Sequence, residues 1–361
     1  MYVLGLMSGS SLDGIDLAVC QFDFEDNRLV AWQIKEAVCL PYDADWQRRL
    51  KTATQLPAKD FMALHADLGR LYAQKINAWL PTIDIKPSLI ASHGHTVFHE
   101  PSLGFSTQIG CGATISQQTG IATVSDFRNS DIAAGGQGAP FAPLADKFLF
   151  SDYQGFINFG GIANISIKTA ENKLVAFDVC ACNALLNAVC QNELGIEYDD
   201  AGKIAQTGQI QPQLLELLNS PEYLLLPYPK SLSNDWVQTN AVQVLLNSAY
   251  SAPDKLRTAT EHIAFQLAKD IRKTLENEKI DPQNRFTLLA TGGGAFNQFL
   301  IEQLGNKIAP HALFIPDSKT INYKEAALMA LMGAFRVLNL PNNLMSATGA
   351  TKDVVCGALY N

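Results

Sequence analysis

The feature that most constrains this chain is the segment at residues 5–16, which reads Gly-Leu-Met-Ser-Gly-Ser-Ser-Leu-Asp-Gly-Ile-Asp. Residues 2–7 are apolar and residues 15–22 alternate, so both flanks are predicted to be strands. Gly9 and Gly14 bracket the turn, and glycines let backbone N–H groups approach an anion that a Cβ would exclude. An ordinary hairpin turn has a similar composition. The second carboxylate on the outgoing strand favours a turn that binds phosphate and, through Asp13 or Asp16, Mg²⁺, directly or through water.

This turn differs from the common nucleotide-binding motifs. It has neither the lysine and following helix of a P-loop nor a Gly-x-Gly-x-x-Gly spacing. A strand–turn–strand phosphate site is instead typical of sugar kinases and actin-like ATPases. Those proteins carry a second phosphate turn and an adenosine-side glycine loop later in the chain, so we expect both here.

Composition excludes several other classes of protein. The 361 residues, of which 47% are hydrophobic, suffice for two domains with a core each. A net charge of −8 without a run of Lys or Arg argues against a nucleic-acid partner. The chain opens on a predicted strand rather than a signal segment, and it contains no span of about 20 apolar residues. Together with seven unpatterned cysteines, this predicts a cytoplasmic protein with no membrane partner.

The first half continues with a strand at 28–38, which predicts an antiparallel meander, and with helices at 45–54 and 58–80. A short strand at 87–92 then leads to three histidines within seven residues. Metal ligation is one interpretation, but no fourth zinc ligand stands nearby. The better interpretation is that these residues are polar groups at a substrate cleft. His95 and Glu100, just past the strand end, are the candidates for substrate contacts.

Residues 126–140 follow further predicted strands at 105–110 and 121–125. They read Asp-Phe-Arg-Asn-Ser-Asp-Ile-Ala-Ala-Gly-Gly-Gln-Gly-Ala-Pro. Charged residues that run into glycines favour a hinge that also lines a site, and a plain interdomain linker is the alternative. We expect the domain boundary here, between a lobe at 1–130 with the first phosphate turn and a lobe at 131–361.

The second half restarts the pattern. Strands at 155–159 and 162–168 flank Gly160-Gly161, which predicts the second phosphate turn, with Asn164 on the outgoing strand. A third strand at 173–177 ends in Asp178, which suits a general base but could equally cap the helix expected from 184. The two cysteines that follow lack zinc-finger spacing, so we interpret Cys180 and Cys182 as small polarizable fillers.

The last predicted site segments follow an amphipathic helix at 254–278. A strand at 286–290 runs into Thr-Gly-Gly-Gly-Ala-Phe-Asn and a helix, which lets a ring or ribose lie against bare backbone at a helix N-terminus. As the third glycine turn in the expected order, this is the predicted adenosine-side loop. Tyr323-Lys324-Glu325 is expected to open a helix to about residue 337, with Glu325 at its N-terminal end.

Together these segments resemble the anhydro-N-acetylmuramic acid kinase family, within the superfamily of sugar kinases, actin and heat-shock ATPases. The resemblance covers nearly the whole chain and is carried by residues 5–16, 92–96, 99–101, 108–110, 126–140, 158–164 and 291–297. It implies an α/β fold of two lobes, an actin-like ATPase (ribonuclease H-like) fold with an interdomain active-site cleft. It also implies a cytoplasmic homodimer that uses ATP, Mg²⁺ and an anhydrosugar.

The activity that the resemblance implies belongs to peptidoglycan recycling. Water opens the 1,6-anhydro ring of the sugar while O6 is phosphorylated, giving N-acetylmuramate 6-phosphate and ADP. The family's catalytic aspartate falls on Asp178, and its hinge arginine on Arg128, available for the lactyl carboxylate. The predicted ATP and phosphate residues are Gly9, Ser10, Ser11, Leu12, Asp13, Gly14, Ile15, Asp16, Gly160, Gly161, Asn164, Gly292, Gly293, Gly294 and Asn297. The predicted substrate residues are His95, Glu100, Arg128, Asp131, Gln137, Asn183 and Glu325, and the predicted Mg²⁺ ligands are Asp13 and Asp16.

The chain departs from the family at three points. Ser10 replaces a usual Thr, Cys180-Ala181-Cys182-Asn183 replaces Gly-Pro-Gly-Asn, and Leu232-Ser233 replaces a Thr-Gly pair. These changes bear on substrate fit more than on reaction class. The alternatives are a kinase for another anhydrosugar such as levoglucosan, a non-catalytic sugar- or nucleotide-binding homologue, and an actin-like assembly protein. Retention of Asp13 and Asp178 argues against the non-catalytic homologue.

Overall fold

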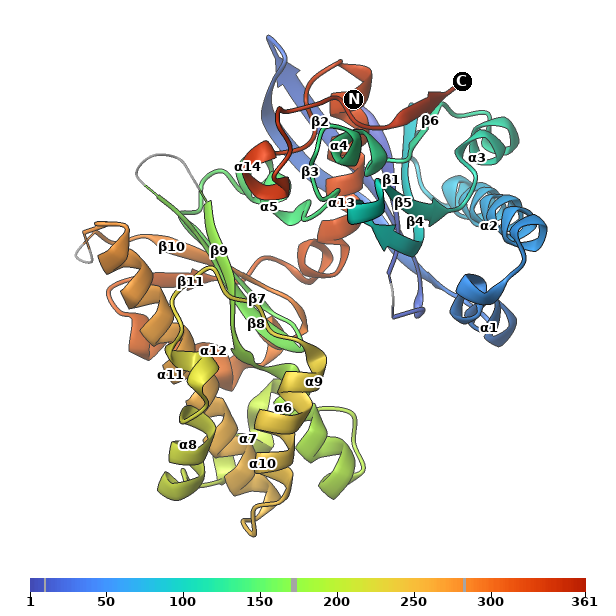
Figure 1. Ribbon diagram of the computed structural model, residues 1–361. Coiled ribbons are helices and arrows are strands. Elements are labelled where there is room, and N and C mark those ends of the chain that lie inside the picture. The colour runs from blue at the N-terminus through green and yellow to red at the C-terminus, as the bar shows by residue number, and fades with distance from the viewer. Residues whose placement is uncertain (10, 170–173, 282–283) are drawn as a thin grey trace. The chain divides into compact units, whose positions relative to one another are not determined.

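The computed structural model describes residues 1–9, 11–169, 174–281 and 284–361 (Figure 1). The chain forms two compact units. Unit 1 comprises Met1–Phe150 and Asn322–Asn361, and unit 2 comprises Ser151–Ile321. This corrects the boundary expected at 130/131, because the glycine-rich segment at 133–140 packs within unit 1 and the C-terminal residues return to it. The return point lies in helix α13 (Ser318–Val337), close to a kink at Tyr323.

Unit 1 is built on a seven-stranded sheet of order β12-β6-β4-β1-β2-β3, with β5 paired to β4. The first three strands form the predicted antiparallel meander, whereas β4 runs parallel to β1 and β6 parallel to β4. The strands are β1 (Tyr2–Ser8), β2 (Gly14–Glu25), β3 (Arg28–Pro41), β4 (Leu89–Glu100), β5 (Phe105–Ile109), β6 (Thr123–Ser125) and β12 (Ala358–Tyr360).

Helices cover both faces of β1. Leu4 and Leu6 lie in a core cluster with Leu68 and Ile76 of the long helix α2, because alternate residues of a strand face the same side. Gly5 faces the other side, where a Cβ would overlap the carbonyl oxygen of Ala326 in α13. The helices of unit 1 besides α13 are α1 (Ala44–Lys51), α2 (Ala58–Trp79), α3 (Gly112–Thr119), α4 (Asn129–Ala133), α5 (Ala142–Phe148) and α14 (Met345–Thr348).

Unit 2 repeats this sheet with five strands of order β11-β10-β7-β8-β9. Three antiparallel strands are again followed by two parallel ones. This duplicated order is that of a ribonuclease H-like unit, and it confirms the predicted α/β, actin-like fold class. The strands are β7 (Gly155–Phe159), β8 (Ile162–Lys168), β9 (Leu174–Ala181), β10 (Thr287–Thr291) and β11 (Ala312–Phe314).

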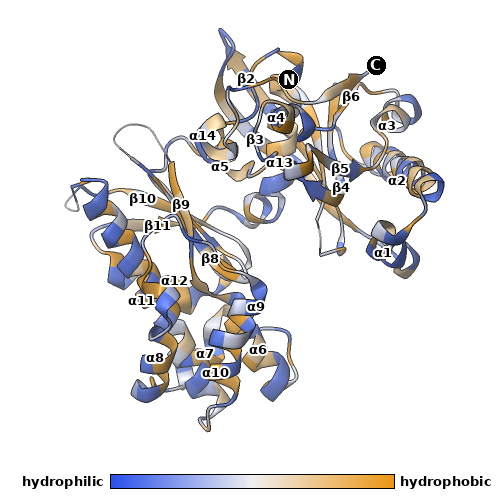
Figure 2. Cartoon of the chain, viewed as in Figure 1, coloured by the Kyte–Doolittle hydropathy of each residue, from blue (hydrophilic) through white to orange (hydrophobic). Residues whose placement is uncertain are grey.

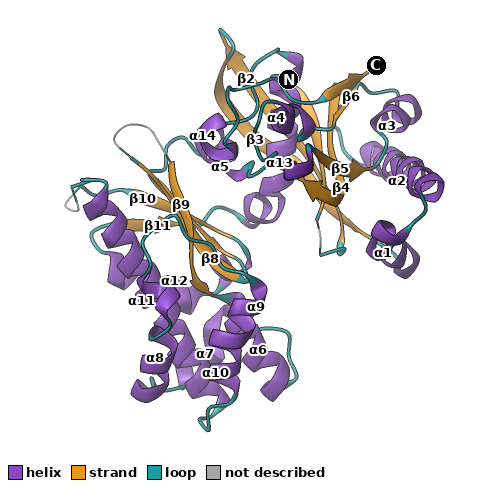
Figure 3. Ribbon diagram, in the orientation of Figure 1, coloured by secondary structure: helices purple, strands orange, loops and turns teal. Residues whose placement is uncertain are grey.

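The main helix of unit 2 is α11 (Ala252–Asn277), which packs against β8 and β9. It begins at the cap Ser251, whose side chain accepts from the N–H of Asp254, and it buries Ile263, Leu267 and Ile271 at helical spacing. Figure 2 shows the hydrophobic residues gathered on the strands and on the sheet-facing sides of the helices. The other helices are α6 (Asn183–Val189), α7 (Lys203–Thr207), α8 (Pro212–Asn219), α9 (Asn234–Val237), α10 (Gln243–Leu246) and α12 (Gln298–Ile308), as Figure 3 shows.

Within the described part of the chain, none of the helices has the length and apolar character needed to cross a membrane.

Candidate active site

The first predicted phosphate turn connects β1 to β2 in unit 1. Ser11 and Asp13 are exposed, whereas Leu12 takes a positive φ of 61° and buries its side chain in the core. The carbonyl oxygen of Leu12 accepts a hydrogen bond from Nε2 of Gln47 in α1 at 3.2 Å, which ties the turn to this helix. Ile15 is also fully buried, so it can offer a ligand only its backbone. Ser10, predicted as a phosphate donor, lies outside the described residues.

The second carboxylate of this turn is held by a thiol. Asp16 is half-buried on β2 and pairs across the ladder with Cys39 of β3. Burial raises the pKa of Asp16, the hydrogen bond with Cys39 opposes the rise, and repulsion from Asp13 adds to it. Burial and the bond to Asp16 raise the pKa of Cys39 to about 11, so this thiol stays protonated and donates at neutral pH.

The residues of this turn fit Mg²⁺. Two carboxylates that repel one another are relieved by a divalent cation, and carboxylate oxygens are the ligands Mg²⁺ prefers. Among the residues described, no group of three or more His, Cys, Asp and Glu side chains could hold a metal ion. Sites that bind Mg²⁺ together with substrate phosphates commonly supply one or two carboxylates, as this turn does.

His95 lies beneath this turn. The sequence expected it just past a strand end, but β4 continues to Glu100, and His95 pairs with Ser8 of β1 inside the sheet. Its Nδ1 lies 3.3 Å from Oγ of Ser8, which also bonds the hydroxyl of Tyr42 at 2.8 Å. Burial lowers the pKa of His95, and a hydrogen bond with the backbone of Ser8 opposes this. His95 is therefore a neutral support behind the turn, while Glu100 is exposed.

Arg128 is held by a histidine that the sequence analysis did not select. Nε and Nη2 of Arg128 lie 3.1 and 2.9 Å from Nε2 of His93, and Nη1 donates to the carbonyl oxygen of Gly138 at 2.6 Å. Nδ1 of His93 lies 3.1 Å from the carbonyl oxygen of Gly94, so Nδ1 carries the proton and Nε2 accepts. Burial, and then the charge of Arg128, lowers the pKa of His93 to about 3. Burial also lowers the pKa of Arg128, which the exposed carboxylate of Glu325 opposes.

Asp131 has a structural role, which corrects its prediction as a substrate ligand. It is fully buried, and its Oδ2 accepts from the N–H of Gly138 at 2.7 Å. Its Oδ1 accepts from Asn343 at 2.6 Å and from Thr348 at 2.7 Å. Asp131, in α4, therefore fixes the segment at 134–138, while Gln137 in that segment is exposed.

In unit 2, four polar residues form one row across neighbouring strands. Thr291 of β10 pairs with Asn158 of β7, Asn158 with Asn164 of β8, and Asn164 with Asp178 of β9. Directly paired residues share a face of the sheet, so these side chains lie on one side. The row sits at the carboxyl ends of the parallel strands β7 and β10, where α/β sheets bind ligands. Asn158 was missed from the sequence, although the Asn-Phe-Gly-Gly string contained it.

Three hydrogen bonds orient Asp178, all from the segment at 223–232. Oδ2 of Asp178 accepts from the N–H of Leu232 at 2.9 Å, and its carbonyl oxygen accepts from the hydroxyl of Tyr223 at 2.7 Å. Its own N–H donates to the carbonyl oxygen of Lys230 at 3.2 Å. The alternative interpretation, a helix cap, does not hold, because the cap position of α6 is Cys182.

The predicted glycine turns of unit 2 gather around α6. The N–H groups of Cys182 and Asn183 donate to the carbonyl oxygens of Gly161 and Gly160. Nδ2 of Asn183 donates to the carbonyl oxygen of Phe159 at 2.7 Å. Segments 160–161, 183 and 292–294, far apart in the sequence, thus meet at one end of this sheet.

The adenosine-side loop needs its glycines for packing as well. Gly292 has a φ of +82°, and a Cβ there would lie 2.7 Å from Oδ1 of Asn158. A Cβ on Gly294 would lie 2.6 Å from Oδ1 of Asn183. Oδ1 of Asn297 accepts from the N–H of Leu300 and so caps α12.

Comparison with known proteins identifies the family. The family model described as anhydro-N-acetylmuramic acid kinase matches residues 1–361. The chain belongs to this family. A relative named anhydro-N-acetylmuramic acid kinase from Actinobacillus pleuropneumoniae serotype 7 is 33% identical to this chain, over 99% of this chain and 98% of the relative. A relative of the same name from Hydrogenovibrio crunogenus is 34% identical, over 99% of this chain and 97% of the relative. The relative from Synechococcus elongatus is 33% identical over 100% and 99%. The predicted class of enzyme, a kinase, is confirmed.

Among solved structures, component A of the (R)-2-hydroxyglutaryl-CoA dehydratase of Acidaminococcus fermentans has a TM-score of 0.45 and 14% identity, over 94% of this chain and 99% of its own. This likeness is too distant to bear on the function.

Two of the three departures from the family motif lie among the described residues, and Ser10 lies outside them. Cys180 and Cys182 are fully buried in the core of unit 2, which confirms their interpretation as fillers. Burial raises the pKa of Cys182 to about 12. Leu232, which replaces a usual Thr, binds Asp178 through its backbone N–H, so this contact does not depend on its side chain.

Proposed function

We propose that this enzyme opens the 1,6-anhydro ring of 1,6-anhydro-N-acetylmuramic acid with water and phosphorylates O6, giving N-acetylmuramate 6-phosphate and ADP. Family membership over the full chain supports this reaction. The observation that carries the chemistry is Asp178, a half-buried carboxylate at the end of a polar row with one oxygen held by a backbone N–H. As its resemblance suggests, we further propose a cytoplasmic homodimer that acts in peptidoglycan recycling.

In this reaction Asp178 is the general base. An anhydrosugar has no free hydroxyl at O6, so the base acts on water rather than on the sugar. With Oδ2 bonded to the N–H of Leu232, we assign Oδ1 to the water proton. The water oxygen bonds to C1, the C1–O6 bond breaks, and O6 attacks the γ-phosphorus, so that ADP leaves.

We assign the phosphates of ATP to the turn at residues 9–16 and to the glycine turn at 160–161. The exposed Ser11 and the backbone N–H groups of the first turn can donate to phosphate oxygens. Asp13 and Asp16 would hold Mg²⁺, directly or through water, and this ion would neutralise charge on the phosphates. The glycine loop at 292–294 with Asn297 is assigned to the adenosine, and Asn164 to the phosphates.

We assign the lactyl carboxylate of the sugar to Arg128. The guanidinium is held by His93 and Gly138, so little side-chain freedom remains to be lost on binding. A planar guanidinium binds a carboxylate with two parallel hydrogen bonds, which levoglucosan could not accept because it lacks the lactyl group. The exposed Glu100, Gln137 and Glu325, together with Asn183, remain proposed sugar contacts.

Labelled water tests the proposed chemistry. Product formed in ¹⁸O-water should carry the label at the anomeric oxygen and none in the phosphoryl group, with rapid trapping and an exchange control because free anomeric hydroxyls exchange. Asp178→Asn should lower kcat by about 10²–10⁴-fold with ATP affinity retained.

The matched control is Asp235→Asn, the same change at an exposed position of α9, which should leave kcat unchanged. Label in the phosphoryl group, or normal turnover by Asp178→Asn, would contradict the mechanism. Faster turnover of levoglucosan than of the muramic sugar would contradict the proposed substrate.

A further inference from the structure

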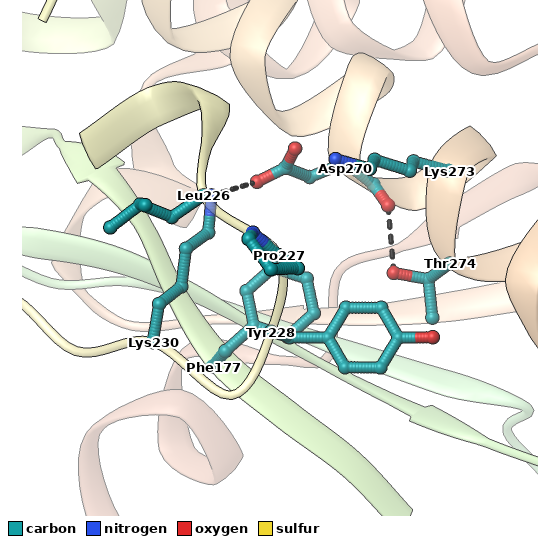
Figure 4. Close-up of a pocket in the computed structure, with 8 residues that line it drawn as sticks. All are labelled: Phe177, Leu226, Pro227, Tyr228, Lys230, Asp270, Lys273 and Thr274. Atoms are coloured by element: carbon teal, nitrogen blue, oxygen red, sulfur yellow. Dashed lines mark hydrogen bonds and ion pairs between the residues drawn. The ribbon is translucent and has the colours of Figure 1, made fainter. Parts of the chain in front are cut away.

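The strongest unexplained feature of unit 2 is a buried ion pair. Nζ of Lys230 lies 2.9 Å from Oδ2 of Asp270 on α11, and their side chains are only 4% and 5% exposed. Figure 4 shows Lys230 reaching from its loop to Asp270, above the rings of Phe177 and Tyr228. Burying two charges costs desolvation energy that their attraction barely offsets, so such a pair is weak evidence for a role in stability.

The pair anchors the segment that orients Asp178. The backbone of Lys230 accepts from the N–H of Asp178, and two residues later the N–H of Leu232 donates to its carboxylate. The residue whose side chain enters the ion pair therefore lies two positions before the donor that bonds Oδ2.

The neighbouring residue of α11 anchors the other end of this segment. Nζ of Lys269 donates to the carbonyl oxygen of Leu224 at 2.8 Å, and the adjacent Tyr223 bonds the carbonyl oxygen of Asp178. Two consecutive residues of one helix thus fix both ends of residues 224–230, and three bonds run from residues 223–232 to Asp178.

We propose that Lys230 and Asp270 are positioning residues for the catalytic base. The inference rests on the proposed function of Asp178. Through the backbone of residues 230–232, the pair fixes the carboxylate so that Oδ2 stays bonded and Oδ1 faces the attacking water. An apolar pair of similar volume can restore folding, but it lacks the 2.9 Å charge–charge contact that joins the loop to α11.

The test compares Lys230→Met with the double variant Lys230→Met/Asp270→Leu. Lys230→Met leaves an unpaired buried carboxylate and should lower the melting temperature and kcat together. The double variant removes both charges and should regain the wild-type melting temperature. Its kcat should remain about 10–100-fold below wild type, the size of loss caused by a small misplacement of a reacting group, with KM for ATP within about twofold. Lys273→Met, the same change at an exposed lysine of the same pocket, is the matched control and should behave as wild type.

Hydrogen exchange supplies a readout besides activity. The amide of Leu232 should exchange faster in the double variant, because its bond to Asp178 is weakened. Wild-type kcat in the double variant, or a lowered kcat with unchanged protection of this amide, would overturn the proposal. If Lys230→Met fails to fold, the double variant decides alone. Normal turnover by Asp178→Asn would instead refute the proposed function, and the exchange of Leu232 would still report whether the pair holds this segment.

Discussion

Acid should destabilise this protein through His93, because the folded state keeps that imidazole neutral. His93 is 4% exposed, and burial with the adjacent charge of Arg128 lowers its pKa to about 3. Its Nε2 accepts from Arg128, so a proton there would remove the acceptor and place a second positive charge beside the guanidinium. Unfolding frees His93 to take up a proton at its ordinary pKa.

The magnitude follows from the difference between the two pKa values. The unfolded imidazole has a pKa of about 6.5, so the unfolded state binds the proton first as the pH falls. The contribution of His93 is therefore fully present above about pH 6.5 and is lost progressively down to about pH 3. Each pH unit below the unfolded pKa lowers the free energy of unfolding by about 1.4 kcal/mol. Because pH 5 lies about 1.5 pH units below that pKa, the free energy of unfolding falls by about 2 kcal/mol.

Urea unfolding at pH 7 and pH 5 measures this loss. His93→Gln keeps an oxygen that can accept from Arg128 but does not titrate, so its loss over this interval should be about 2 kcal/mol smaller than that of wild type. Burial also lowers the pKa of His262 in unit 2 to about 3. His262→Gln should reduce the loss of unfolding free energy between pH 7 and pH 5 by a similar amount. The effects of the two substitutions should add, because the two residues share no partner. An equal loss in His93→Gln and wild type would refute this reasoning.

Two further predictions concern carboxylates of unit 1. Asp131→Asn should cost about 3 kcal/mol of unfolding free energy, because its amide group turns a donor toward other buried donors. Thr348→Val removes one short bond to Asp131 and two longer contacts, with the carbonyl oxygen of Leu344 and the N–H of Ala350, and should cost less, about 1–2 kcal/mol. Urea unfolding measures both, and wild-type stability with a raised KM for the sugar would restore Asp131 as a substrate ligand. Asp16→Asn should raise the Mg²⁺ concentration for half-maximal activity at least about tenfold, since loss of a metal-site partner typically costs 10–100-fold. Cys39→Ser, which keeps a donor to Asp16, is its control, and an unchanged Mg²⁺ requirement in Asp16→Asn would contradict the metal assignment.

Much of the fold could be predicted from the sequence because its signals are local. Alternating apolar residues predicted the strands around the turn at 9–13, and apolar residues spaced four apart predicted α11. The three glycine turns, in their order along the chain, predicted the duplicated architecture that the two sheets display. Strings such as those at 5–16 and 126–140 also sufficed to predict the family.

Only the tertiary structure showed which polar residues hydrogen-bond to other parts of the protein and so have a structural role. Asp131 looked like a hinge carboxylate beside glycines, but its partners Asn343 and Thr348 lie 212 and 217 residues further along the chain. His93 and His95 have similar sequence surroundings, yet only His93 meets Arg128, because pairing of β4 with its neighbours sets which side chain faces which element.

The orientation of Asp178 was equally beyond the sequence. The residues that fix it, Leu232 and Tyr223, are 54 and 45 residues away, and the pair of Lys230 with Asp270 joins a loop to a helix. Propensity and periodicity describe residues within one or two turns of each other, whereas burial and hydrogen bonding depend on contacts made only when distant segments pack. The sequence therefore determined the secondary-structure elements and the polar residue types available to a site. Packing determined which of these groups are buried, hydrogen-bonded and fixed in position.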